Sequence, residues 1–363
     1  MNKHIKRILI AVIVAAVWCG ALWLCQRLLT PKYMDDLVEG SLTREYYDET
    51  TTHDVIFVGD CEVYENFSPV TLWEQYGITS YIRGSAQQLI WQSYYLLEDA
   101  LRYETPKVAV FNVLSMKYSE PQSEEYNRLT LDGMKPSVTK LNAVKASMTE
   151  DEEAITYAFP LLRYHDRWSQ LTKTDLKYMF RRDKISHNGF LMRVDSRPVT
   201  SVPEPEPLAD YSFSENCWDY LDKMRDLCAA NGIKLVLIKS PVLYPAWYEQ
   251  WDEQIAAYAA ENGLDYINYL DLIDEIGIDF YGENADTYDM GLHLNLAGAE
   301  KLSAHFGEWA KERFALADHR SDPAFSSVWQ EKTDFYYRMK QDQYDVLEKY
   351  GTLKNYYKRS NLR

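Results

Sequence analysis

Short apolar runs alternate with helical patterns over two parts of the chain. Runs at residues 55–58, 80–82 and 107–113 predict buried strands, and the intervening segments 70–76 and 88–103 have helical apolar spacing. The alternation resumes with a helical pattern at 217–230, strands at 234–239 and 264–268, and helices at 247–261 and 295–314. This order predicts an α/β fold: a doubly wound parallel sheet with helices on both faces, in three layers α/β/α.

Between the two parts the alternation stops. Residues from about 118 to 214 combine charged helical segments with several prolines, which predicts a mostly helical insertion on the sheet domain. We expect residues 33–54, which are polar and acidic, to form a stalk, and residues 318–363 to form a C-terminal helical tail. The sheet domain would then occupy residues 55–317.

A longer apolar run comes before all of these elements. Residues 8–25 contain no charged side chain, and a run of this length can span a bilayer. No small-x-small cleavage site follows, which favours an uncleaved anchor within residues 1–32 over a cleaved signal peptide. Lys3, Lys6 and Arg7 precede the run, so we expect a cytoplasmic N-terminus, a single-pass protein of the cell membrane and an extracytoplasmic main domain.

Net charge and cysteine spacing exclude some classes of partner and site. The formal net charge is -16, and the first 32 residues hold basic side chains but no acidic ones, so the rest of the chain is more acidic still. Such a surface repels phosphate backbones and argues against nucleic acid as a partner. The spacing of the five cysteines suggests neither a zinc site nor a disulfide scaffold, and we expect no metal and no cofactor.

Chemically useful residues stand where the predicted strands end. Cys61 follows the first strand, Gly84 the second, Asn112 lies near the end of the third, and Asp289 and His293 precede the last helix. In a doubly wound sheet such positions meet at one edge. A nucleophile, oxyanion donors and an acid–base pair are what acyl transfer needs. Each residue also has a structural alternative, such as an inert buried cysteine or a helix cap.

These blocks resemble those of the SGNH (GDSL-type) hydrolases, whose three-layer fold agrees with the predicted alternation. The resemblance implies Cys61 as nucleophile, His293 as general base and Asp289 as the residue that orients it. It also implies Gly84 and Asn112 as oxyanion donors. The anchor and the segment HLNLAGAEKLS resemble extracytoplasmic SGNH proteins that accompany membrane-bound O-acyltransferases, including the partner protein of teichoic-acid D-alanylation. A cell-envelope polymer as substrate and such an acyltransferase as partner are therefore implied.

The sequence departs from the family pattern at three points. The nucleophile position holds Cys61 instead of serine, the acid and base are one residue further apart than D-x-x-H, and Asn112 lacks the usual flanking glycine and aspartate. Asp286 is consequently a rival to Asp289. The chain is thus either an acyltransferase or esterase that works through a cysteine acyl-enzyme, or an inactive scaffold that binds a polymer or a membrane-bound acyltransferase.

The insertion carries a second group of candidates. Arg163, His165 and Arg167 concentrate positive charge in an acidic body and could bind an anionic polymer. The alternative is that they pair with carboxylates of the same chain.

Overall fold

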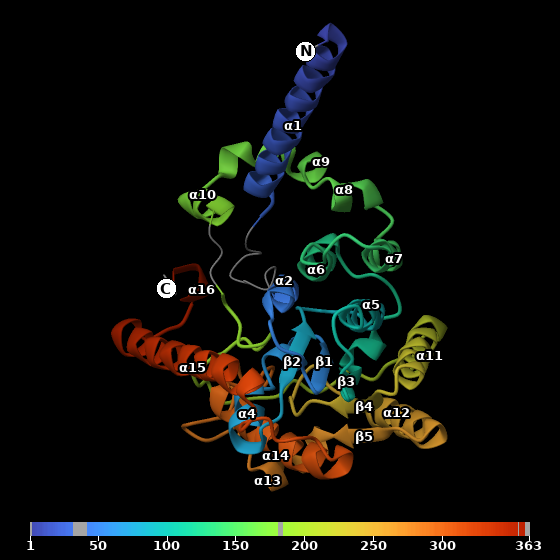
Figure 1. The fold of residues 1–363 in the computed structure, drawn as a ribbon. Coiled ribbons are helices and arrows are strands. Elements are labelled where there is room, and N and C mark those ends of the chain that lie inside the picture. Colours follow the sequence, from blue (N-terminus) through green and yellow to red (C-terminus); the bar gives the residue numbers. More distant parts are fainter. Residues whose placement is uncertain (1, 32–41, 181–183, 355, 360–363) are drawn as a thin grey trace.

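The centre of the molecule is a sheet of five parallel strands. The computed structural model describes residues 2–31, 42–180, 184–354 and 356–359. Its strand order is β2–β1–β3–β4–β5 (Figure 1). The strands are β1 (Val55–Gly59), β2 (Ser80–Gly84), β3 (Val108–Asn112), β4 (Lys234–Lys239) and β5 (Asp265–Asn268). This order is that of flavodoxin-like folds and confirms the doubly wound sheet that the sequence predicts.

The two faces of the sheet are covered by different helices. Successive strand residues point to opposite faces, so Val55 and Phe57 join one buried cluster and Ile56 and Val58 join the other. The first face carries α3 (Cys61–Tyr64), α4 (Pro69–Tyr76), α14 (Leu296–Phe314), α15 (Pro323–Tyr350) and α16 (Tyr356–Arg359). The second carries α5 (Ile90–Ala100), α11 (Glu215–Ala230) and α12 (Glu249–Asn262). The α/β/α layering is therefore confirmed.

Strand β2 is longer than the pattern predicts. The apolar run predicts a strand that ends at residue 82, but Arg83 and Gly84 also belong to the strand and pair beside β1. The Arg83 guanidinium is buried against the Asp99 carboxylate at 3.1 Å, so a charged residue continues the strand without exposing it. Sequence periodicity does not reveal such a buried ion pair.

The insertion divides into a helical half and an extended half. The helical half comprises α6 (Glu124–Leu131), α7 (Val138–Ser147), α8 (Ala154–Ala158), α9 (Leu161–Tyr164), η4 (His165–Gln170) and α10 (Lys173–Phe180). Residues 185–199 form no helix, and Ile185, Phe190 and Met192 are buried in the core of the first face. The Ile82 N–H donates to the Asn188 carbonyl at 2.9 Å, so this segment pairs with the outer strand β2 and covers that edge of the sheet.

Both ends of the body pack against its centre. Of the predicted stalk, residues 32–41 lie outside the described residues, and the next elements are α2 (Leu42–Glu45) and η2 (Tyr46–Asp48), where Leu42 and Tyr46 are buried. Helix α15 lies along α4 (Figure 1) and contributes Tyr336 and Met339 to the core of the first face. The remaining short elements are η3 (Val113–Lys117), η5 (Tyr269–Leu272) and α13 (Ile273–Ile276).

Helix α1 (Lys3–Leu29) projects away from the body (Figure 1). Its 27 residues have an apolar window of mean hydropathy 2.6, of which no part is buried inside the protein. A helix of 27 residues is about 40 Å long, which exceeds the roughly 30 Å of a bilayer core. The helix is therefore compatible with a single-pass anchor, and a signal sequence has the same character.

Candidate active site

Cys61 lies at the point where the strand order of the sheet reverses. The order places β2 on one side of β1 and β3 on the other, and ligand sites in open α/β sheets form at this switch point, beyond the carboxyl ends of the strands. Gly59 ends β1 with φ +156, and a Cβ there would meet the Val63 side chain at 2.5 Å, so only glycine permits the turn. Cys61 then begins α3, after the cap residue Asp60, whose carboxylate accepts the Glu62 N–H at 3.1 Å.

The loop before α14 holds the predicted base, His293. The His293 Nδ1 lies 2.6 Å from Asp289 Oδ2, and the His293 backbone N–H donates to the other oxygen at 2.9 Å. Met290 and Gly291 have φ of +66 and +97, and this turn brings the Asp289 carboxylate back to the ring despite the extra residue between them. The rival Asp286 instead accepts from the Lys301 ammonium at 2.6 Å.

The second ring nitrogen of His293, Nε2, is buried and has no hydrogen-bond partner in the described part of the chain. The imidazole lowers the pKa of the Cys61 thiol, and the thiol raises that of the imidazole, so the two side chains interact. Asn66 fixes the spacing of the two loops: its Oδ1 accepts the Leu294 N–H at 2.9 Å, one residue after His293. The structure thus pairs His293 with Asp289 and places Cys61 near the imidazole, and the roles of nucleophile, base and orienting carboxylate stay a prediction.

Two residues that the sequence did not indicate complete this side of the site. The Glu65 carboxylate lies 3.9 Å from His293 Nδ1, and the Tyr288 hydroxyl donates to Glu65 and lies 3.3 Å from the same nitrogen. Glu65 stands four positions after Cys61, a spacing that places both side chains on one helical face. That spacing is the signal that could have found it.

Burial and the surrounding carboxylates govern the protonation of the pair. Burial raises the pKa of the Cys61 thiol to about 11, against the opposing influence of His293. Burial alone would lower the pKa of His293, but the charges of Glu65 and Cys61 and the hydrogen bond with Asp289 raise it well above the usual range. The two groups titrate as a coupled pair, and the reactive form is the one in which the thiol has lost its proton.

The predicted oxyanion donors contact the neighbours of Cys61 in sequence, and both are engaged in the fold. The Asn112 amide nitrogen lies 3.2 Å from the Asp60 carboxylate and 3.0 Å from that of Glu62. A Cβ on Gly84 would lie 3.1 Å from the Gly59 carbonyl oxygen, so this glycine lets β2 pack closely beside the end of β1. Asn112 would have to release one carboxylate to donate to an oxyanion.

Two lysines interact with Asp60 and Glu62, the acidic residues on either side of Cys61. The buried Lys239 ammonium lies 2.9 Å from the Glu62 carboxylate. Burial lowers the pKa of Lys117, which interacts electrostatically with Asp60, Glu62 and Cys61. Lys117 ends the segment that follows β3, and this position beyond a strand end is the signal that sequence reasoning could have used.

The basic residues of the insertion are elsewhere and are largely paired. Arg163 donates to Glu124 at 3.0 Å, and Arg167 forms an ion pair with Asp175 at 2.8 Å. His165 Nδ1 lies 3.1 Å from the Leu162 carbonyl. Polymer binding by these three residues stays a prediction. Among the described residues, no group of three histidine, cysteine or acidic side chains could hold a metal ion.

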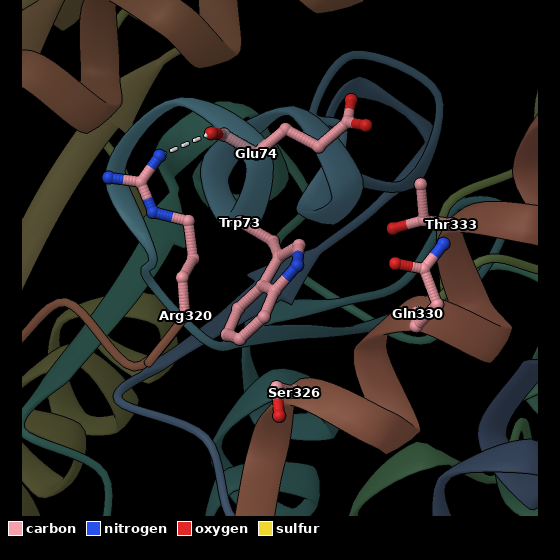
Figure 2. Close-up of a pocket in the computed structure, with 6 residues that line it drawn as sticks. All are labelled: Trp73, Glu74, Arg320, Ser326, Gln330 and Thr333. Atoms are coloured by element: carbon pink, nitrogen blue, oxygen red, sulfur yellow. Dashed lines mark hydrogen bonds between the residues drawn. The ribbon is translucent and has the colours of Figure 1, made fainter. Parts of the chain in front are cut away.

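A separate pocket of about 350 Å³ lies between α4 and α15 (Figure 2). Its lining consists of Trp73, Glu74, Arg320, Ser326, Gln330 and Thr333. Arg320 is already bound, because it donates to the Glu74 carbonyl at 2.7 Å and pairs with Asp318. With neither cysteine nor histidine in the lining, this pocket lacks the nucleophile–base pair found at the end of β1.

Comparison with protein-family models gives no match, and comparison with characterised protein sequences gives none either. Among solved structures, the chain is similar to an acylhydrolase candidate from Bacteroides fragilis NCTC 9343, with 13% identity and a TM-score of 0.37 over 75% of this chain and 95% of the other. It is also similar to a GDSL-like lipase from Bacteroides thetaiotaomicron VPI-5482, with 14% identity and a TM-score of 0.36 over 76% and 99%. At these values the similarity concerns the fold, and the chemistry is argued from the site itself.

Proposed function

We propose that the chain is a membrane-anchored SGNH-like acyltransferase or esterase that acts on a cell-envelope polymer through a cysteine acyl-enzyme. The observation that carries the proposal is the series Cys61, His293 and Asp289 at the switch point of the sheet, with Asp289 held 2.6 Å from the imidazole. The sequence blocks that resemble SGNH hydrolases place the same residues in these roles.

The reaction would proceed in two halves. His293 takes the proton of the Cys61 thiol, and the sulfur attacks the carbonyl carbon of an ester. The carbon–oxygen bond to the leaving alcohol breaks, the alcohol receives the proton from His293, and a thioester remains. A hydroxyl of the acceptor, or water, then loses its proton to His293 and attacks the thioester carbon, which releases the thiol. Asp289 would hold the ring and stabilise its charged form throughout.

The membrane assignment is supported by the way α1 meets the body. The Arg167 guanidinium donates to the Leu29 carbonyl at 2.9 Å, and the Arg27 guanidinium donates to the Tyr178 carbonyl at 3.3 Å. If α1 were a cleaved signal peptide, the mature protein would lose Leu29 and Arg27, and with them both hydrogen bonds. We therefore infer a retained anchor, with Lys3, Lys6 and Arg7 in the cytoplasm and the body on the other side.

An inactive scaffold is the second candidate, and one observation favours it. Both acidic neighbours of Asn112 engage its amide nitrogen, so a donor that an oxyanion would need is occupied. On this hypothesis the body binds a polymer or a membrane-bound O-acyltransferase without forming an acyl-enzyme.

Intact-mass analysis of the full chain after incubation with an activated aryl ester distinguishes the enzyme hypothesis from the scaffold hypothesis. The acyltransferase or esterase should gain one acyl group on Cys61, and Cys61→Ala should gain none. His293→Ala should slow acylation by about 100- to 10,000-fold, the usual contribution of a general base. Cys25→Ala, which removes an exposed thiol of α1, is the matched control and should react like the parent. Acylation that survives Cys61→Ala would overturn the mechanism, and an unreactive parent would favour the scaffold.

A further inference from the structure

Short helices flank the end of α1 on two sides where it reaches the body (Figure 1). They are α8, α9, η4 and α10, residues 154–180, and are called the collar below. Of these elements, α9, η4 and α10 contact α1 directly. The Leu29 carbonyl and the Arg27 side chain of α1 are hydrogen-bonded to Arg167 and Tyr178 of the collar.

The collar exposes more large apolar side chains than the rest of the described body, tyrosines apart. Trp168 is 71% exposed and Phe180 is 84% exposed. Four further collar residues expose large apolar side chains: Ile155, Phe159, Leu162 and Leu176. In the described body outside the collar, tyrosines apart, the exposed large apolar side chains are Val138, Leu141, Val202 and Leu208. The exposed apolar side chains of the described body are thus concentrated on the collar, and such a concentration is typical of an interaction site.

The position of the collar along α1 indicates the partner. The uncharged run of α1 ends at Cys25, and Leu29 lies four residues beyond it, or about 6 Å along the helix axis. The polar headgroup layer on each side of a bilayer core is about 5–8 Å thick. When the uncharged run spans the core, the hydrogen bond between Leu29 and Arg167 lies within the headgroup layer, beside Trp168.

We propose that the collar lies in the interfacial layer of the membrane and that Trp168 and Phe180 insert among the lipid headgroups. The proposal rests on the assignment of α1 as a retained anchor. Amphipathic tryptophan is typical of this layer, and short helices with one apolar face can lie in its plane. The body would then be held against the bilayer at two places, by α1 and by the collar beside it.

Both arginines of the collar are used elsewhere, so its charge contribution to this contact comes from Lys173 and Lys177. Arg163 pairs with Glu124 and Arg167 with Asp175, so each has a carboxylate partner within the protein. In this proposal the six exposed apolar side chains carry the contact, so zwitterionic lipid should be sufficient for it. The same ion pairs explain why this surface suits a membrane better than an anionic polymer.

Photocrosslinking of the full chain in phosphatidylcholine nanodiscs tests the proposal. The photoreactive residue p-benzoylphenylalanine replaces Trp168 or Phe180 in single variants, and mass spectrometry of the peptides detects lipid adducts. Trp18 of α1 is the matching position for the anchor, and Tyr281, which is 65% exposed on the body, is the control for a surface in water.

We expect lipid adducts at positions 18, 168 and 180 and none at 281. Adducts at 18 without adducts at 168 or 180 would overturn the collar proposal while keeping the anchor. Crosslinks between two copies of the chain at 168 or 180 would overturn it in favour of a protein contact. Absence of adducts at 18 would refute the anchor and, with it, the collar. The acylation of Cys61 is measured separately, so failure of the chemistry is distinguishable from each of these results.

Discussion

Glu65 should set the pH at which Cys61 becomes reactive. Its carboxylate lies 3.9 Å from His293 Nδ1, and its charge raises the pKa of both His293 and Cys61. Glu65→Gln removes this charge but keeps a side-chain oxygen that can accept the Tyr288 hydroxyl. The pKa of both members of the pair should therefore fall, and the midpoint of Cys61 reactivity should move to lower pH.

The size of the effect follows from the distance. Two unit charges 3.9 Å apart interact by about 1 kcal/mol in a water-like dielectric and by about 4 kcal/mol at an effective dielectric constant of about 20. About 1.4 kcal/mol corresponds to one pKa unit, so the midpoint should fall by about one to three pH units. Glu65 and His293 are largely buried, which favours the upper part of this range. The two groups titrate together, and the measured midpoint belongs to the pair.

Alkylation of Cys61 by iodoacetamide gives the midpoint without knowledge of the substrate, because the thiolate is the reacting form. Peptide mass spectrometry separates Cys61 from the other four cysteines, and the rate is followed from neutral to strongly alkaline pH. Glu74→Gln removes an exposed charge from α4 and should leave the midpoint unchanged. An unchanged or higher midpoint in Glu65→Gln would refute the electrostatic reasoning for this site.

Two further substitutions test the residues that support the site. Asp289→Asn should slow the acylation of Cys61 by an aryl ester by about 100- to 10,000-fold, whereas Asp286→Asn should keep nearly the parental rate; the reverse order would make Asp286 the residue that orients His293. Lys239→Met leaves the buried Glu62 without its cation and should lower the free energy of unfolding by about 3–5 kcal/mol in chemical denaturation. Adding Glu62→Gln should recover part of this loss, and no recovery would contradict an uncompensated charge as the cause.

The sheet could be predicted because its strands are nearly continuous apolar runs, and the strand ends could be predicted with it. Cys61, Asn112 and His293 were therefore placed at one edge before their contacts were known. The choice between Asp289 and Asp286 could not be made, because it depends on a turn in which Met290 has φ +66. A non-glycine residue in that conformation leaves no clear mark in the sequence.

The helical prediction for the second half of the insertion failed for a related reason. Residues 185–199 were expected to belong to a mostly helical insertion, yet they form no helix: Asn188 pairs with β2, and Phe190 and Met192 lie in the core. Their apolar side chains follow no helical or strand period, because their pairing is set by the edge of a strand a hundred positions earlier. Local pattern cannot report a partner so distant in sequence.

The packing of α15 against the first face of the sheet has a consequence for synthesis. Lys332 of α15 pairs with Glu49, a residue 283 positions earlier, and the neighbouring Tyr336 and Met339 share a core with Val55 and Phe57. At about 5–20 residues per second, ribosomes make this interval in roughly 15–55 s. During that time the first strand has been made but one of its covering helices has not. The first face of the sheet therefore stays partly uncovered until α15 has been made, and removal of α15 would remove part of the core.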